Sequence, residues 1–154
     1  MKIGVPKEIK PQENRIGLTP DSVKTLTSNG HEVLVQSDGG FEAGFDNSQY
    51  KSAGAKIVDK AEDIFNDAEI IVKVKEPLSN EVKMLRENQI VFTYLHLAAA
   101  KELTKGLVDS KAVCIAYETV TDNNGRLPLL APMSAVAGRM SVQAGAHCLE
   151  KNQK

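Results

Sequence analysis

The chain has 154 residues, the length of one ordinary globular domain, and 42% of them are hydrophobic. Its 19 Lys and Arg residues nearly balance 20 Asp and Glu residues, so the formal net charge is −1. Nucleic acids and anionic membranes are bound through clustered positive charge, and this balance argues against both partners. The longest uncharged stretches, 88–100 and 127–138, are shorter than the ~20 apolar residues of a membrane span. Because Lys7 also interrupts any signal-peptide core, we expect a cytoplasmic protein.

Short apolar runs alternate with helix-like segments along the chain. Strands are predicted at 3–5, 31–36, 56–58, 69–75, 89–95 and 112–118, and helices at 20–29, 47–53, 60–66, 79–86, 99–109 and 132–151. Such alternation indicates βαβ units, so the predicted fold is an open, doubly wound α/β domain with a mostly parallel sheet, Rossmann-like or flavodoxin-like in class. The apolar runs 90–95 and 113–116 predict central strands that are buried on both faces.

Several local signals add detail to this pattern. Thr19 and Pro20 predict the start of the first helix, and Ser79 is expected to cap the helix at 79–86. The final helix has no C-terminal capping residue in 150–154, so we expect that it is truncated in this chain. The two cysteines, Cys114 and Cys148, have no metal-binding spacing and are predicted to be small buried hydrophobic residues.

The residues that follow the predicted strands form the candidate site, because ligands of open α/β sheets bind outside the carboxyl ends of the strands. An arginine holds a carboxylate through two hydrogen bonds, a lysine adds a positive charge, and a histidine exchanges protons near neutral pH. Together these side chains predict a site that binds a small carboxylate or keto acid and moves a proton on it. The candidates are Lys7, Glu8, Glu13 and Arg15 after the first strand, Lys73 and Lys75 in the fourth, Tyr94 and His96 after the fifth, and Glu118 after the sixth.

Each candidate has a simpler interpretation that the residues alone leave open. Arg15 could be a solvated loop cation, and Lys73 and Lys75 could line a sheet edge. His96 could be a hydrogen-bonded core histidine, because its neighbours are apolar. Glu118 could simply be an acceptor for the hydrogen bonds of a neighbouring loop.

A dinucleotide fingerprint is missing from the sequence. Neither Gly-x-Gly-x-x-Gly nor Gly-x-x-x-x-Gly-Lys-Ser/Thr occurs, and Gly39, Gly40 and Gly44 fit neither spacing. If the protein uses a dinucleotide, we expect the phosphate-binding loop to lie outside this chain.

Nine segments resemble one known family. Residues 1–8 with 13–20, 30–35, 53–55 and 72–77 resemble the N-terminal signature shared by alanine dehydrogenases and the NAD-binding subunit of proton-translocating transhydrogenase. Residues 92–98, 115–120, 127–134 and 136–139 are more similar to alanine dehydrogenase, since the transhydrogenase subunit lacks the His-Leu-Ala segment at 96–98.

Family members are much longer, and the resemblance implies that this chain is a truncated N-terminal portion. It implies a substrate-binding domain at 1–130 and, at 131–154, the start of an interdomain helix that leads to an absent NAD-binding domain. The intact family forms hexamers, so a homo-oligomer is implied for the whole protein.

The resemblance also implies a reaction, in which L-alanine, NAD and water give pyruvate, ammonium and NADH. Arg15 and Lys75 would hold the carboxylate and carbonyl oxygen, and His96 would be the general acid and base. Lys75 and His96 are thus the implied catalytic residues, while Tyr94 and Glu118 would line the pocket. Met133 and Ser134 would face the NAD cofactor, and no metal is implied.

Three hypotheses follow for the chain. The first is the substrate-binding part of an alanine dehydrogenase, expected to be inactive alone. The second is a fragment of the transhydrogenase subunit, and the third is a stand-alone module that binds keto acids without catalysis.

Overall fold

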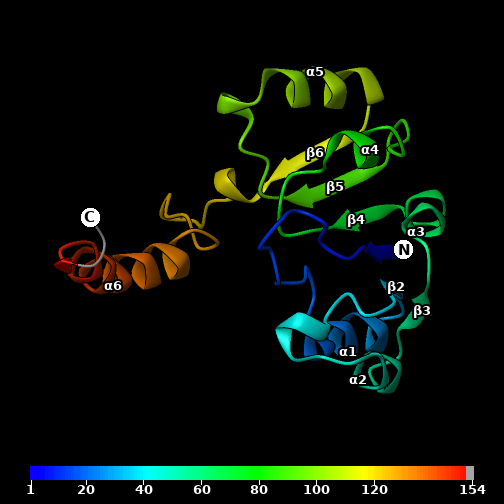
Figure 1. Cartoon of the computed structure of the whole chain (residues 1–154). Coiled ribbons are helices and arrows are strands. Elements are labelled where there is room, and N and C mark those ends of the chain that lie inside the picture. The colour runs from blue at the N-terminus through cyan, green and yellow to red at the C-terminus, as the bar shows by residue number, and fades with distance from the viewer. Residues whose placement is uncertain (152–154) are drawn as a thin grey trace. The chain divides into compact units, whose positions relative to one another are not determined.

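Six parallel strands form one sheet in the first of the chain's two compact units, Met1–Ala116. The structure is a computed structural model and describes residues 1–151 (Figure 1). The strands are β1 (Lys2–Val5), β2 (Glu32–Gln36), β3 (Lys56–Val58), β4 (Ile70–Val72), β5 (Ile90–Thr93) and β6 (Val113–Ala116), in the order β3-β2-β1-β4-β5-β6. Every neighbouring pair is parallel, which confirms the predicted sheet.

Helices cover both faces of this sheet. They are α1 (Pro20–Ser28), α2 (Asn47–Ser52), α3 (Ala61–Asp67), α4 (Ser79–Val82) and α5 (Lys101–Ser110). Alternate residues of a strand point to opposite faces, and β2 shows the result. Val33 and Val35 share a core with Tyr50 of α2, whereas Leu34 belongs to a second core with Phe65 of α3.

The strand order places a topological switch point between β1 and β4. From β1 the chain winds outward to β2 and β3, then returns through α3 to β4 on the other side of β1. In open parallel sheets the crevice at such a point is the usual ligand site. The loops that follow β1 and β4 therefore flank the expected site.

The fourth strand is shorter than the predicted 69–75 and ends at Val72. The Glu8 carboxylate accepts the N–H groups of Val74 and Lys75 at 2.6 and 3.3 Å, so these two groups bond to a side chain and not to β1. Towards β5, backbone hydrogen bonds continue from the Lys73 N–H to the Phe92 carbonyl and from the Tyr94 N–H to the Val74 carbonyl. The interpretation of Lys73 as a sheet-edge residue is wrong, since its side chain is completely buried between two carboxylates.

The helix predicted at 79–86 ends at Val82, because the last turn tightens into a bond from the Met84 N–H to the Glu81 carbonyl. Ser79 does not cap it but is its first helical residue. The Glu81 carboxylate accepts the Leu78 N–H at 2.8 Å instead.

The prediction of a central strand at 113–116 is also wrong, because β6 is an edge strand. Val113 and Ile115 are 47% and 42% exposed. An apolar run shows that a strand forms but not where it lies in the sheet. The prediction for 90–95 is confirmed in part: β5 lies between β4 and β6, and Val91, Thr93 and Leu95 on one face are buried. Ile90 and Phe92 on the other face are only half-buried.

The second unit begins at Tyr117 and contains α6 (Ala131–Cys148). This helix confirms most of the predicted 132–151, and the part of the C-terminal prediction that falls on 152–154 lies outside the described residues. Cys148 is exposed and Cys114 is half-buried, so the expected burial of Cys148 is wrong. Within residues 1–151, no helix combines the length and apolar character that crossing a membrane requires.

Candidate functional site

Arg15 lies in the long loop between β1 and α1, where Glu13 holds its guanidinium group. Its Nε and Nη2 atoms donate to the two Glu13 carboxylate oxygens at 2.8 and 2.6 Å. The Arg15 side chain is 50% exposed, whereas that of Glu13 is only 7% exposed. The hydrogen bonds from Arg15 lower the pKa of the Glu13 carboxyl to about 2, and the same pair raises the pKa of Arg15. The guanidinium group of Arg15 is therefore fixed by Glu13, and Arg15 is not a freely solvated loop cation.

This pair should make the fold sensitive to acid. The pKa of Glu13 lies below the 4.5 of an unperturbed glutamate, so the pair stabilises the fold fully above pH 4.5. The contribution then disappears as the pH falls towards 2. We expect Glu13→Gln to cost about 2 kcal/mol at neutral pH, a value reduced by solvent around Arg15, and about a quarter of that at pH ~2.5, which lies just above the shifted pKa. Urea denaturation across this pH range measures the difference in free energy of unfolding between the variant and the wild type. For Glu32→Gln on β2, the control, we expect no such difference. A difference for Glu13→Gln that stays constant with pH would contradict the assignment.

The end of the loop that carries Arg15 is fixed by contacts with strand β4 and with helix α2. Gly17 packs so closely on β4 that a Cβ atom added there would lie 2.7 Å from the Val72 carbonyl oxygen. The Tyr50 hydroxyl donates to the Leu18 carbonyl at 2.9 Å, and burial raises the pKa of Tyr50 to about 12. Tyr50 therefore remains a donor at neutral pH, and the loop is fixed to both β4 and α2.

Lys75 follows β4 and faces the Arg15 loop. Its positive charge contributes to the lowered pKa of Glu13, so the two cations of the predicted site share one acidic neighbour. The Lys75 carbonyl accepts a hydrogen bond from the Thr93 hydroxyl at 2.9 Å. Lys75 is half-buried, in contrast to Lys73, which is fully buried.

Tyr94 and His96 lie two residues apart in the segment that follows β5. Their rings stack with centroids 6.3 Å apart and planes 27° apart. Tyr94 is buried, and its electrostatic interaction with Arg15, one cause of the raised pKa of Arg15, places it in the same cluster. His96 is exposed, so the interpretation as a core histidine is wrong.

The backbone of His96 is left-handed, with φ 50° and ψ 36°. A side chain in this region costs roughly 1–2 kcal/mol, and such strain is often found at functional sites. We expect His96→Gly to be about 1 kcal/mol more stable than His96→Ala, because both lose the ring and only glycine relieves the strain. Thermal unfolding of the two variants measures the difference, and equal stability would contradict a strained backbone.

Glu76 and Lys10 form an ion pair that connects the first loop to the residue after Lys75. Burial alone would raise the pKa of the Glu76 carboxyl, but the hydrogen bond from Lys10 and the charges of Lys10 and His96 lower it overall. His96 therefore lies close enough to Glu76 to interact with it electrostatically. Within residues 1–151, no group of three His, Cys, Asp or Glu side chains has the arrangement of a metal site.

The structure thus brings together Arg15, Lys75, Tyr94 and His96 at the carboxyl ends of β1, β4 and β5. The other three predicted site residues belong to the second unit. Glu118 lies in a short 3₁₀ turn, Tyr117–Thr119, directly after β6, and Met133 and Ser134 lie in the first turn of α6.

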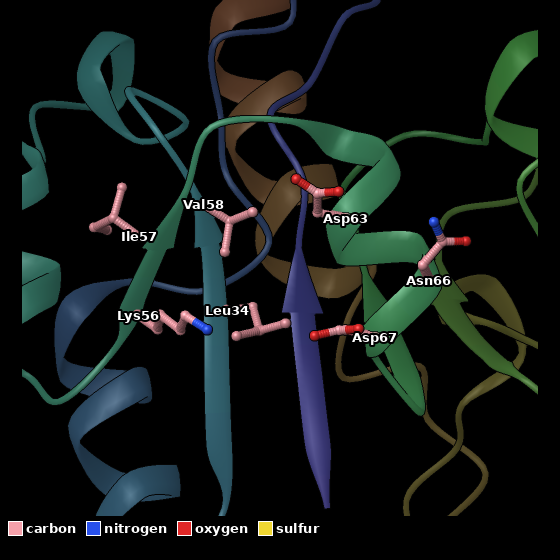
Figure 2. Close-up of a pocket in the computed structure, with 7 residues that line it drawn as sticks. All are labelled: Leu34, Lys56, Ile57, Val58, Asp63, Asn66 and Asp67. Carbon is pink, nitrogen blue, oxygen red and sulfur yellow. The ribbon is translucent and has the colours of Figure 1, made fainter.

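Two hollows of the first unit are lined by none of these residues. One is a groove of about 440 Å³ between β3 and α3, with side chains from β2, β3 and α3 around it (Figure 2). The other, of about 460 Å³, lies between α4 and α5. Beside Arg15, Glu8 and Glu13 lies a cavity of about 10 Å³, which is room for about one water molecule.

The sequence placed Glu8 and Glu13 among the candidates of the first loop but did not show which groups they bind. Thr93 was predicted only as a strand residue. The spacing Glu13-x-Arg15 is the one local signal, because a two-residue separation lets the carboxylate accept from both the Arg15 backbone and its side chain. The partners of Glu8 lie more than 60 residues away, and no local pattern reveals them.

The transhydrogenase alternative is the more distant relative of this chain. The solved structure of a transhydrogenase from Sinorhizobium meliloti covers 80% of this chain and 35% of that chain, with 24% identity and a TM-score of 0.75. This similarity shows the fold alone. A solved L-alanine dehydrogenase covers 99% of this chain and 42% of that chain, with 53% identity and a TM-score of 0.92.

Curated sequences give the same result. Alanine dehydrogenase of Halomonas elongata is 57% identical over 99% of this chain, and that of Geobacillus stearothermophilus is 56% identical over 98%. This chain spans about 41% of the length of each relative. The family model described as the alanine dehydrogenase/PNT N-terminal domain matches residues 4–137. The chain therefore belongs to the family of alanine dehydrogenase/PNT N-terminal domains.

Proposed function

We propose that this chain is the substrate-binding part of an NAD-dependent L-alanine dehydrogenase, and that its substrate half-site binds pyruvate or L-alanine. The observation that carries the proposal is the pair of cations at the switch point of the sheet. Arg15 after β1 and Lys75 after β4 share the neighbour Glu13, and the β1–β4 pairing brings their loops to one place. Two positive charges there suit a small carboxylate that carries a second oxygen.

In this proposal each side chain has one task. Arg15 holds the substrate carboxylate, and Lys75 donates to the carbonyl oxygen of pyruvate and stabilises the negative charge that develops on it. His96 gives and takes the proton as ammonia adds to the carbonyl carbon and water leaves. Its exposed position at the end of β5 leaves it accessible to a substrate, while Tyr94 supports its ring. Glu118 is proposed as a further substrate-binding residue.

NAD, when bound in the parent protein, supplies the hydride acceptor. The first strand and helix of this chain do not fit its pyrophosphate, because the turn after β1 contains Pro6, Lys7 and Glu8 and no glycine. The N-terminus of α1 is separated from β1 by the whole Arg15 loop. We propose Met133 and Ser134 as the residues of this chain that contact the cofactor.

The same proposal covers the organisation of the parent protein. Residues 1–130 would be the substrate-binding domain and 131–154 the start of the interdomain helix. The parent protein would be a cytoplasmic homo-oligomer that converts L-alanine to pyruvate and ammonium. The purified 154-residue chain alone should form no NADH from L-alanine.

Calorimetric titration with pyruvate tests the half-site. We expect weak binding to the wild-type chain and a loss of at least about tenfold in affinity for both Arg15→Ala and Lys75→Ala, since each removes a charged hydrogen bond. Lys51→Ala, a surface lysine in the last turn of α2, is the matched control and should bind as the wild type does. Equal affinity in all four proteins would overturn the proposal.

A further inference from the structure

Three charged side chains form a buried cluster directly beneath the proposed half-site. The Lys73 ammonium donates to Glu8 Oε2 at 3.2 Å and to Glu81 Oε1 at 2.7 Å. The exposed fractions of the Lys73, Glu8 and Glu81 side chains are 0%, 2% and 3%. Desolvating charges is costly, and this cluster also holds one carboxylate more than it has cations. The bonds made by the remaining carboxylate oxygens therefore show what the cluster holds in place.

Each carboxylate uses its second oxygen to bind backbone. Glu8 Oε1 accepts the N–H groups of Val74 and Lys75 at 2.6 and 3.3 Å. Glu81 Oε2 accepts the N–H of Leu78 at 2.8 Å. The cluster thus fixes both ends of the segment 74–78, and Glu8 is the member that binds Lys75.

The backbone of Lys75 is held from a second side as well. The Thr93 hydroxyl, buried on β5, donates to the Lys75 carbonyl at 2.9 Å. Glu8 comes from the loop after β1 and Thr93 from β5, so the two contacts bind the end of β4 to both of its neighbouring strands. With its N–H and carbonyl both held, Lys75 can move only through the torsions of its own side chain.

We propose that Glu8 and Thr93 are positioning residues that fix the backbone of Lys75, so that its ammonium group points to the substrate oxygen beside Arg15. The inference rests on the proposed function, in which Lys75 binds that oxygen. Neither residue touches the substrate, and each acts through the peptide groups of Lys75. Misplacement of a binding group by about 1 Å is enough to weaken a site strongly.

Two isosteric variants separate positioning from stability. In Glu8→Gln the new amide can serve Lys73 or the backbone N–H groups, but not both, because its nitrogen has no acceptor capacity. Glu81→Gln suffers the same loss in the same cluster, but the backbone it releases is Leu78. We expect both variants to lower the melting temperature by similar amounts. Only Glu8→Gln should weaken pyruvate binding, by about tenfold.

The amide order parameter of Lys75, measured by NMR without pyruvate, gives a readout that does not depend on substrate. It should fall from about 0.85 to below about 0.6 in Glu8→Gln and remain high in Glu81→Gln. If it stays high in Glu8→Gln, the positioning role is overturned. If it falls while the wild-type chain shows no pyruvate binding, the proposed function fails and the backbone role of Glu8 stands.

Thr93 provides a test if Glu8→Gln does not fold. Thr93→Val removes the hydroxyl that holds the Lys75 carbonyl, whereas Thr93→Ser retains it. We expect Thr93→Val to weaken pyruvate binding by about threefold to tenfold and Thr93→Ser to bind nearly as the wild type does. Equal affinity of these two variants would overturn the inference.

Discussion

Replacing Lys73 by methionine is expected to lower the free energy of unfolding by about 3–5 kcal/mol, because it leaves two buried carboxylates without their cation. Lys73 is the completely buried member of the cluster and bonds to both Glu8 and Glu81. Methionine has a similar length and keeps the packing, so the loss reports the charge alone. Urea denaturation at neutral pH measures it directly.

Lys2→Met is the matched control for this substitution. Lys2 forms an ion pair with Asp67 at 3.7 Å, but the two side chains are 36% and 57% exposed. Exposed pairs contribute at most about 1 kcal/mol, so this variant should change the free energy of unfolding little. If Lys73→Met and Lys2→Met had the same effect, the buried cluster would not be the structural element described.

Gly17→Ala is expected to lower the free energy of unfolding by about 1–3 kcal/mol and to weaken pyruvate binding. The added Cβ would lie 2.7 Å from the Val72 carbonyl oxygen and 3.0 Å from its carbon. Both are backbone atoms of β4, so the Arg15 loop must move away from the strand. That movement increases the distance between Arg15 and Lys75, and the affinity falls with it.

Gly138→Ala in α6 is the control for this change. A Cβ there meets no atom within 4 Å outside its own helix turn, and alanine is the better helix former. This variant should leave the unfolding of the first unit and the affinity for pyruvate unchanged. If Gly17→Ala bound pyruvate as tightly as Gly138→Ala, the contact between the Arg15 loop and β4 would have no role in binding.

Local patterns predicted where the elements lie. The strand at 56–58 is found with the same limits. The helix predicted at 20–29 begins at Pro20, since Thr19 accepts the Ser22 N–H as a capping residue should, and it ends one residue early, at Ser28. Alternation of strands and helices was enough to predict the doubly wound sheet. These features depend on residues close together in the sequence.

Contacts between distant segments could not be predicted. The burial of Lys73 depends on Glu8, which is 65 residues away, and Glu8 also accepts the N–H of Val74 after β4. The exposure of His96 depends on its left-handed backbone, which its apolar neighbours gave no reason to expect. The edge position of β6 depends on the strand order, which composition does not reveal. The family resemblance supplied the roles of the site residues, and those roles remain proposals.

The most direct test of the central claim is an amide NMR titration of the 154-residue chain with pyruvate. We expect the largest shifts at Arg15, Lys75, Tyr94 and His96, around the switch point between β1 and β4. Shifts concentrated instead at Lys56, Asp63 and Asp67, which line the groove between β3 and α3 in Figure 2, would place the ligand elsewhere and contradict the claim. The absence of any shift at pyruvate concentrations up to about 100 mM, far above a Kd of 1 mM, would show that the half-site does not bind pyruvate in this chain.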